Sequence, residues 1–254
     1  MFMNWRQVGW LIAATLAFFT VLFLNFPKID LWFSSFFFSG AFRQGNNLTF
    51  EFIRYLFIDG LTILAILSFV MLLRSWLIGP RRAVPLQVWG YIVATFLTGP
   101  IIMANGIFKA YWGRARPAEI EFFGGTSDFT PPILMADQCD RNCSFVSGEG
   151  SAIATFIIVY AVVVWPNLTR RWKAVTLYVG LPMALIGIAL RIITGRHFLS
   201  DTVFAVLYCG AIAWAFFQIF DMRLFRRTFT WQNLKSDLSK AKPRDDVSVT
   251  GAGK

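Results

Sequence analysis

Six apolar runs constrain the fold of this chain more than any other feature. Each run holds about twenty mostly apolar residues, the length that an α-helix needs to cross the hydrocarbon core of a bilayer. Hydrophobic residues make up 56% of the 254 positions, compared with roughly 45–50% in an ordinary soluble domain. The sequence therefore predicts an all-α integral membrane protein in which six transmembrane helices form a bundle. The predicted spans cover approximately residues 8–26, 51–73, 88–108, 148–166, 174–192 and 201–220.

Lysine and arginine residues mark one side of the membrane. They gather between the second and third spans, between the fourth and fifth spans, and after the sixth span. Short loops rich in these residues stay in the cytoplasm, and six helices with both termini inside require this alternation. Residues 1–220 are therefore expected to form one membrane domain. Residues 221–254 are expected to form a basic cytoplasmic tail that is disordered beyond its first turn.

The remaining loops are expected to face the opposite side. The first of them, residues 27–50, contains LWFSSFFF, and this aromatic density favours a helix at the membrane interface over a loop packed on the protein. The long second loop, residues 109–147, contains Cys139 and Cys143. These cysteines form either a disulfide, if the loop faces an oxidising compartment, or two free thiols. Their spacing alone does not decide between the two.

Three polar stretches stand at the ends of spans on this outer side: KAYWGRARP at 109–117, CSFVSGEGS at 143–151 and RIITGRHFLSD at 191–201. Ionisable groups in such places are costly unless they are paired or hydrated, so they are candidate functional residues. Lys109, Arg116 and Arg191 suit an anion site, because a guanidinium fork matches phosphate oxygens and lysine adds a point charge. Ser147 and Gly148 precede a predicted helix, whose first N–H groups and dipole also favour an anion. Together these residues predict a phosphate-binding site.

The third stretch contains His197, the one histidine of the chain. Asp201 follows four residues later, which places both side chains on one helical face. A carboxylate bonded to one ring nitrogen fixes the tautomer and makes the other nitrogen a better nucleophile. With one histidine and no clustered acids in these stretches, a metal hydrolase is not indicated. We therefore expect neither a metal nor another cofactor.

The order and spacing of these residues are similar to a known three-part signature. The matching elements are Lys109–x6–Arg116–Pro117, then Ser147–Gly148, then Arg191–x5–His197–x3–Asp201. This pattern resembles that of the type 2 phosphatidic acid phosphatase (PAP2) superfamily, and the resemblance covers about residues 88–220. It implies a six-helix membrane phosphatase that works without a metal, through a phosphohistidine intermediate.

The resemblance also implies a role for each matching residue. His197 is expected to be the nucleophile and Asp201 its orienting partner. The phosphate oxygens are expected to be held by the cations of the first and third stretches and by the start of the helix at 148, namely by Lys109, Arg116, Arg191, Ser147 and the N–H group of Gly148.

Two positions depart from the pattern. The serine that usually precedes the arginine of the third motif, a supporting element, is Leu190 here. The larger departure is Glu149, which stands where the family has the histidine that acts as general acid. Glu149 either donates a proton to the leaving alcohol, or binds an amino group of the substrate or an arginine such as Arg116 or Arg196, or caps its helix. If the donor role is lost altogether, the chain is a weakened or inactive relative.

The second span adds Arg54 and Asp59, about one helical turn apart. The two residues are expected to pair with each other rather than to contact a lipid headgroup.

The middle motif, Ser-Gly-Glu, resembles the lipid A phosphatase branch of the superfamily. The expected substrate is therefore a phosphomonoester of lipid A, at the 4′ or the 1 position, on the periplasmic side of a bacterial inner membrane. Phosphatidylglycerophosphate and undecaprenyl pyrophosphate are alternative substrates. A non-catalytic binder or transporter of anionic lipids is the alternative from another class. The expected partner is thus a phospholipid or lipid A within the membrane, with no nucleic acid and no obligate protein partner.

Overall fold

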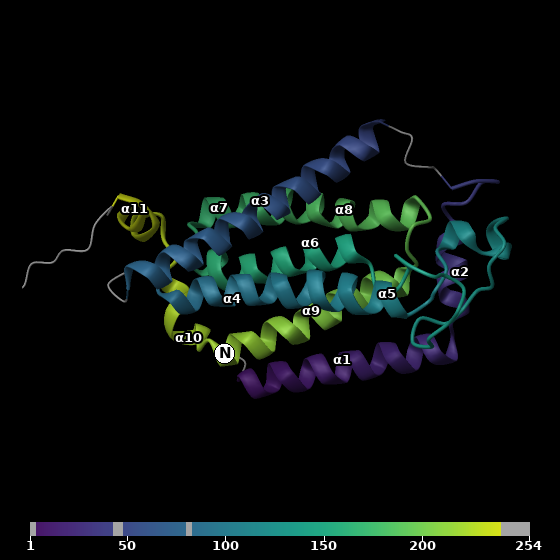
Figure 1. The fold of residues 1–254 in the computed structure, drawn as a ribbon, viewed down its shortest axis with the longest axis horizontal. Helices are drawn as coiled ribbons and strands as arrows, with labels where there is room; N and C mark the ends of the chain where they lie inside the picture. The colour runs from purple at the N-terminus through teal and green to yellow at the C-terminus, as the bar shows by residue number, and fades with distance from the viewer. Residues whose placement is uncertain (1–3, 43–47, 80–82, 240–254) are drawn as a thin grey trace, which may run out of the picture.

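The computed structural model describes residues 4–42, 48–79 and 83–239, and within them the chain forms helices and no β-strand (Figure 1). Among these residues, six helical segments are long and apolar enough to cross a membrane: Trp5–Asn25, Arg54–Leu77, Leu86–Tyr111, Gly148–Asn167, Arg170–Ile193 and Leu199–Ile219. These segments confirm the predicted all-α class and the six predicted spans. The observed limits lie within four residues of the predicted ones.

Several spans combine α-helical and π-helical segments. The first three spans consist of α1 (Trp5–Asn25), α3 (Leu48–Ile78), and α4 (Leu86–Phe96) continued by a π-helical segment (Leu97–Phe108) and α5 (Lys109–Tyr111). The other three consist of α6 (Gly148–Val159) with a π-helical segment (Tyr160–Val164), then α7 (Arg170–Val175), a π-helical segment (Thr176–Gly180) and α8 (Leu181–Ile193), and finally α9 (Leu199–Ile219). Pro100 lies inside the π-helical part of the third span. Because proline has no N–H group to donate, it interrupts the regular α-helical hydrogen bonding there.

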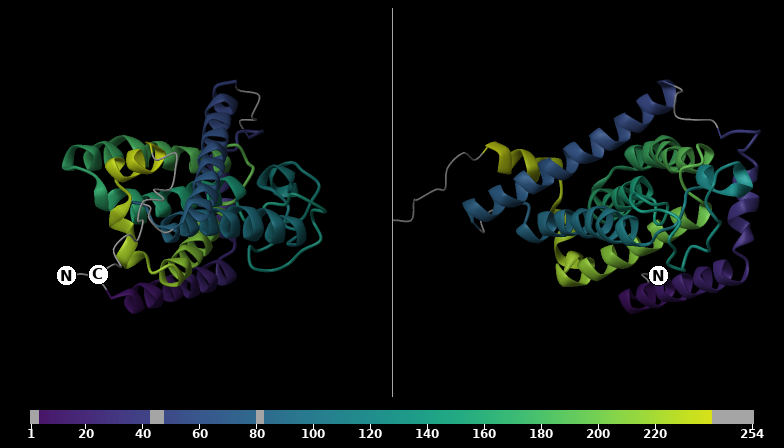
Figure 2. Two further views of the ribbon diagram at one scale, coloured as in Figure 1. Left: turned by 60° about the vertical axis from the view of Figure 1, so that its left-hand side comes forward. Right: turned by 45° about the vertical axis from the view of Figure 1, so that its right-hand side comes forward.

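Helix α6 lies at the centre of the bundle. It packs against α8, α9 and the π-helical segment that follows α4, and Figures 1 and 2 show these helices around it. Helix α1 packs on α9, whereas α3 crosses the bundle obliquely and packs chiefly on α4 (Figure 1). The short helix α2 (Lys28–Ser35) and the loop of residues 112–147 cover one end of the bundle (Figure 1). The first turn of α6 is therefore enclosed by the ends of its neighbours.

Two clusters of buried apolar side chains pack between the helices, one at each end of the bundle. One includes Val88 and Phe217. The other includes Phe145 and Phe204 and lies beneath the loop-covered end. Large apolar side chains elsewhere face outward, such as Tyr178, which is 81% exposed. An apolar exterior is what a bilayer requires of a membrane-spanning bundle.

The aromatic stretch of the first outer loop forms a helix, α2, as expected. Trp32 on this helix and Phe36 just after it are exposed, whereas Asp30 and Ser34 are buried on the other side of the helix. These two aromatic side chains therefore face away from the protein, while Phe37 and Phe38 pack against a buried apolar cluster. The position of α2 at a membrane interface remains a prediction.

The tail expected to be disordered is helical in part, so that expectation is wrong for its first half. After α10 (Met222–Phe225), residues Trp231–Ser239 form α11 at the end of the bundle opposite to α2 (Figure 1). The buried carboxylate of Asp237 accepts hydrogen bonds of 2.9 Å from the backbone N–H groups of Ala83 and Val84, which otherwise have no helical partner. This tertiary contact outweighs the polar composition of the segment. Residues 240–254, and the loop residues Arg81 and Arg82, lie outside the described residues.

Candidate active site

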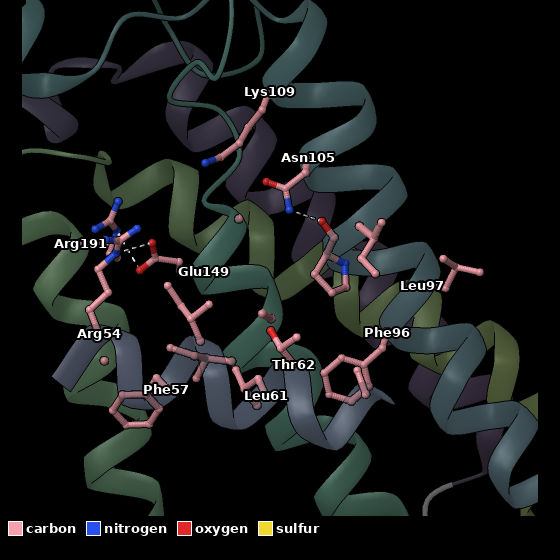
Figure 3. Close-up of a pocket in the computed structure, with 18 of the residues that line it drawn as sticks. Arg54, Phe57, Leu61, Thr62, Phe96, Leu97, Asn105, Lys109, Glu149 and Arg191 are labelled. Atoms are coloured by element: carbon pink, nitrogen blue, oxygen red, sulfur yellow. Dashed lines mark hydrogen bonds and ion pairs between the residues drawn. The ribbon is translucent and has the colours of Figure 1, made fainter. Parts of the chain in front are cut away.

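The three polar stretches meet at the end of the bundle covered by α2. They border a cavity of about 590 Å³ between α3, the third span, α6 and α8. Figure 3 shows Lys109, Glu149 and Arg191 converging at one end of this cavity, with Phe57 and Phe96 along its other part. The cavity therefore joins a charged end to an apolar wall, as a ligand with an ionic headgroup and a hydrocarbon tail requires.

His197 lies in the turn between α8 and α9 and is 1% exposed. Its Nδ1 atom lies 2.7 Å from the carbonyl oxygen of Ser144. Since a carbonyl oxygen can only accept, we infer that Nδ1 carries the proton and that Nε2 keeps its lone pair. Burial lowers the pKa of His197 to about 4; the charges of Lys109 and Arg191 act in the same direction, against the opposing effect of the Asp201 carboxylate. The imidazole is therefore neutral near pH 7, as a nucleophile must be.

Asp201 lies in the first turn of α9 but does not bind the ring of His197 as directly as expected. Its Oδ2 atom is 3.8 Å from Nδ1 of His197, which is an electrostatic contact and too long for a hydrogen bond. The same oxygen instead accepts hydrogen bonds from Ser144 Oγ at 2.5 Å and from the Phe198 N–H group at 2.8 Å. Ser144 therefore stands between the two residues, because its hydroxyl binds Asp201 and its carbonyl binds His197.

Lys109 and Arg116 are held by one loop residue. Nζ of Lys109 donates to Oδ1 of Asn142 at 3.3 Å, and Nη2 of Arg116 donates to the Asn142 carbonyl at 2.6 Å. Asn142 lies inside the ring closed by a disulfide between Cys139 and Cys143, which decides between the two states that the sequence left open. Its φ of 55° is left-handed, a conformation that asparagine tolerates better than most residues.

Ser147 and Gly148 begin α6 as the sequence predicted. Oγ of Ser147 accepts a hydrogen bond of 3.1 Å from the Gly150 N–H group and so caps the helix. A Cβ atom at Gly148 would lie 2.7 Å from Oδ1 of Asn105 and 3.3 Å from Cε of Lys109. Glycine is therefore needed where α6 approaches the third span. The predicted contacts of Ser147 and Gly148 with a phosphate remain predictions.

Glu149 pairs with two arginines, although with different ones from those expected. Its Oε1 accepts a hydrogen bond of 3.0 Å from Nε of Arg54, and its Oε2 lies 3.2 Å from Nε of Arg191 (Figure 3). Arg54 thus binds an acid on another helix, and its expected pairing with Asp59 stays a prediction. The carboxylate connects α3 to α8 at the charged end of the cavity.

This geometry agrees with the comparison of the sequence with known protein families. Residues 87–225 match the family model of the PAP2 superfamily. The chain belongs to the PAP2 superfamily. Membership supports the predicted membrane lipid phosphatase, a phosphoric monoester hydrolase, and accounts for the six-helix bundle.

The PAP2 chain is also similar to individual proteins. It is 29% identical over 203 residues to the lipid A 4′-phosphatase of Francisella tularensis subsp. novicida (strain U112), covering 78% of this chain and 89% of that protein. It is 30% identical over 204 residues to the lipid A 4′-phosphatase of Rhizobium leguminosarum, covering 72% of this chain and 83% of that protein. No solved structure matches the chain.

The sequence interpretation missed two charged residues that hold the site of this PAP2 protein. Arg114 lies in the first polar stretch without an assigned role, and Asp30 immediately precedes the aromatic stretch of the first outer loop and was not among the candidate residues. Both side chains are fully buried and form an ion pair, with Nη2 of Arg114 2.8 Å from Oδ2 of Asp30. A lone acid among aromatic residues is a sequence signal for such a buried partner, because an unpaired charge is costly to bury.

The cations at this site suit a phosphate group. Lys109, Arg191 and Arg196 line the cavity, and the charge of Arg196 acts on Arg116. Among the residues that the structure describes, no group of three or more His, Cys, Asp or Glu side chains is arranged to hold a metal ion. The chemistry that this chain itself provides is thus a neutral imidazole beside an anion-binding cluster.

Proposed function

We propose that this PAP2 protein is a lipid A 4′-phosphatase that acts through a phosphohistidine at His197. The observation that carries the proposal is the neutral, buried imidazole of His197, which feels the charges of Lys109 and Arg191, two cations that line the charged end of an apolar-walled cavity. A phosphorylated lipid is the ligand class that fits both parts of this cavity. The similarity to relatives named lipid A 4′-phosphatase supports lipid A as the lipid and the 4′ position as the site of hydrolysis.

In the first step, Nε2 of His197 attacks the phosphorus atom and the bond to the sugar oxygen breaks. The Nδ1–H group remains bound to the Ser144 carbonyl, so the tautomer is already the reactive one. The positive charge that develops on the ring is balanced by Asp201, 3.8 Å away. Lys109, Arg116 and Arg191 hold the oxygens of the transferred phosphoryl group, whose charge spreads in the transition state.

The leaving sugar oxygen needs a proton, and we assign its donation to Glu149. A phosphate bound by Arg191 competes with Glu149 for that guanidinium, which frees one carboxyl oxygen to carry a proton. In the second step, water attacks phosphorus, the P–N bond breaks, and Glu149 accepts the proton that water loses. Inorganic phosphate leaves, and His197 returns to its neutral form.

The proposed reaction takes place on the periplasmic side, with both termini in the cytoplasm. The disulfide between Cys139 and Cys143 supports this orientation, because such bonds persist in oxidising compartments. The first turns of the fifth span contain Arg170, Arg171 and Lys173 and lie at the end of the bundle opposite to the site, where the positive-inside rule places the cytoplasm.

Phosphate release by the purified protein tests the proposal. Lipid A, phosphatidylglycerophosphate and undecaprenyl pyrophosphate are supplied in parallel, and mass spectrometry identifies the position that loses phosphate. We expect loss of the 4′-phosphate from lipid A, abolished by His197→Ala. Turnover of another lipid with lipid A untouched would replace the substrate assignment. Full activity of His197→Ala would overturn the mechanism, and no turnover of any lipid would favour a non-catalytic binder.

A further inference from the structure

A buried charge cluster lies behind the site and does not border the cavity. Arg114 is its centre and is fully buried. Its Nη1 donates to Oδ1 of Asp201 at 2.5 Å and to Oγ of Ser200 at 2.9 Å, and its Nη2 donates to Oδ2 of Asp30 at 2.8 Å. Its Nε donates to the Thr130 carbonyl at 2.9 Å. With its donors directed at protein atoms, Arg114 is unsuited to bind a substrate phosphate, unlike the arginine two residues later.

Asp30 attaches the same cluster to α2. Its Oδ1 accepts a hydrogen bond of 2.9 Å from the Ser200 N–H group, and its Oδ2 accepts one from the Ser200 hydroxyl. Ser200 lies in the first turn of α9, next to Asp201. The carboxylate of Asp30 therefore satisfies a backbone donor at the start of the helix that carries Asp201, and it binds Arg114 at the same time.

The cluster continues to the nucleophile through Ser144. Asp201 accepts from Arg114 with one oxygen and from Ser144 with the other, and the Ser144 carbonyl lies 2.7 Å from Nδ1 of His197. All members of this chain of contacts are at most 1% exposed. Because water does not reach these groups, each charge depends on its neighbour for compensation. A change at Asp30 must therefore alter how Arg114 holds Asp201.

We propose that Asp30 is a positioning residue for the phosphatase reaction: through Arg114 it fixes the carboxylate of Asp201, and through Asp201 and Ser144 it fixes the ring of His197. The inference rests on the proposed function. Asp30 precedes the 87–225 segment matched by the family model, so the proposal makes α2 part of the active-site assembly. Asp30 does not touch the substrate, and its effect is expected in kcat rather than in KM.

The test is a double-mutant cycle in the full-length protein. Asp30→Asn removes the charge at nearly constant size, and Glu121→Gln removes an exposed charge from the same side of the protein as a matched control. We expect kcat for phosphate release to fall about 10–100-fold in Asp30→Asn with KM nearly unchanged, as supporting residues of a site typically show, and Glu121→Gln to behave like the wild type. Because Asp30 acts through Asp201, adding Asp30→Asn to Asp201→Asn should cost little more.

Two results would overturn the inference: wild-type kcat in Asp30→Asn, or losses that multiply in the double variant. Should Asp30→Asn fail to fold, as judged by gel filtration in detergent, Ser200→Ala takes its place in the cycle. It removes only the hydroxyl between Arg114 and Asp30, so we expect a smaller fall in kcat. Adding Ser200→Ala to Asp201→Asn should likewise cause little further loss. If the wild type releases no more phosphate than His197→Ala, the proposed function fails and this inference fails with it.

Discussion

The carbonyl oxygen of Ser144 lies 2.7 Å from Nδ1 of His197, closer than Asp201 does at 3.8 Å. Ser144 thus determines the tautomer, while Asp201 provides the charge and holds Ser144 through its hydroxyl. The motif alone predicts that Asp201 binds and orients the ring of His197, whereas in the structure these two tasks are divided between Ser144 and Asp201.

The division predicts different costs for two substitutions. Ser144→Ala keeps the carbonyl but removes a hydrogen bond to a charged group, so we expect kcat to fall roughly 10-fold. Asp201→Asn leaves the geometry similar but removes the charge opposite the ring, and we expect a loss of about 10²-fold or more, as in histidine–aspartate pairs elsewhere. Phosphate-release kinetics measure both, with Ser127→Ala in the outer loop as the control. Equal losses in the two variants would contradict the division of roles.

The protonation of His197 can be observed directly, because the chain has one histidine. Its pKa is lowered to about 4 by burial, compared with about 6.5 in the unfolded chain. We therefore expect the ring in ¹⁵N-histidine-labelled protein to stay neutral from pH 8 down to pH 5 in NMR spectra. A titration midpoint near 6.5 would show that the ring is not buried as described.

The lowered pKa of His197 also makes the free energy of unfolding depend on pH. Between pH about 6.5 and about 4, the unfolded chain binds a proton at His197 that the folded protein does not bind. Unfolding is therefore favoured as the pH falls from about 6.5 to about 4. Above pH about 6.5, this destabilising effect of His197 is absent. We expect the thermal transition of the wild type to drop more between pH 6.5 and 4.5 than that of His197→Ala. Parallel curves would contradict the assignment.

The two roles of Glu149 can be separated by the leaving group of the substrate. A proton donor contributes about 10²–10⁴-fold when the leaving group is a sugar alcohol, and much less when it is a phenol of low pKa. Glu149→Gln should therefore lower kcat strongly on lipid A and weakly on p-nitrophenyl phosphate. Arg54→Gln disturbs the ion pair but keeps the acid, so we expect it to affect the two substrates alike. A large loss on both substrates in Glu149→Gln would assign Glu149 to positioning Arg191.

The disulfide is expected to support phosphate binding through Asn142. Reduction frees the ring that holds Asn142 against Lys109 and Arg116, so these cations should lose alignment and KM should rise about 10-fold, which corresponds to about 1.4 kcal/mol. Steady-state kinetics with and without a reductant measure this change. A variant with serine at both Cys139 and Cys143 should show the raised KM and no response to the reductant. A wild-type KM in that variant would show that the disulfide-closed loop does not contribute to substrate binding.

Much of the fold could be predicted because its signals are local. A span is recognised by its own run of apolar residues, and the positions of Lys109 and Arg191 follow from motif spacing. The contacts that organise the site, in contrast, join residues that are far apart in the sequence. Arg114 and Asp30 are 84 positions apart, and Arg54 and Glu149 are 95 positions apart. No local pattern encodes such pairs, because they depend on how α2 and α3 pack against the rest of the bundle.

The helical tail also depends on a contact between residues far apart in the sequence, and this contact yields a prediction about stability. Asp237 on α11 accepts hydrogen bonds of 2.9 Å from the Ala83 and Val84 N–H groups with its two oxygens. Asp237→Asn can accept with one oxygen only and leaves a buried donor unpaired, at a cost of about 1–3 kcal/mol. We expect a lower thermal transition in detergent, with phosphate release unchanged below it, whereas Gln232→Ala on the exposed side of α11 should leave both unchanged. An unaltered transition in Asp237→Asn would mean that α11 does not depend on this contact.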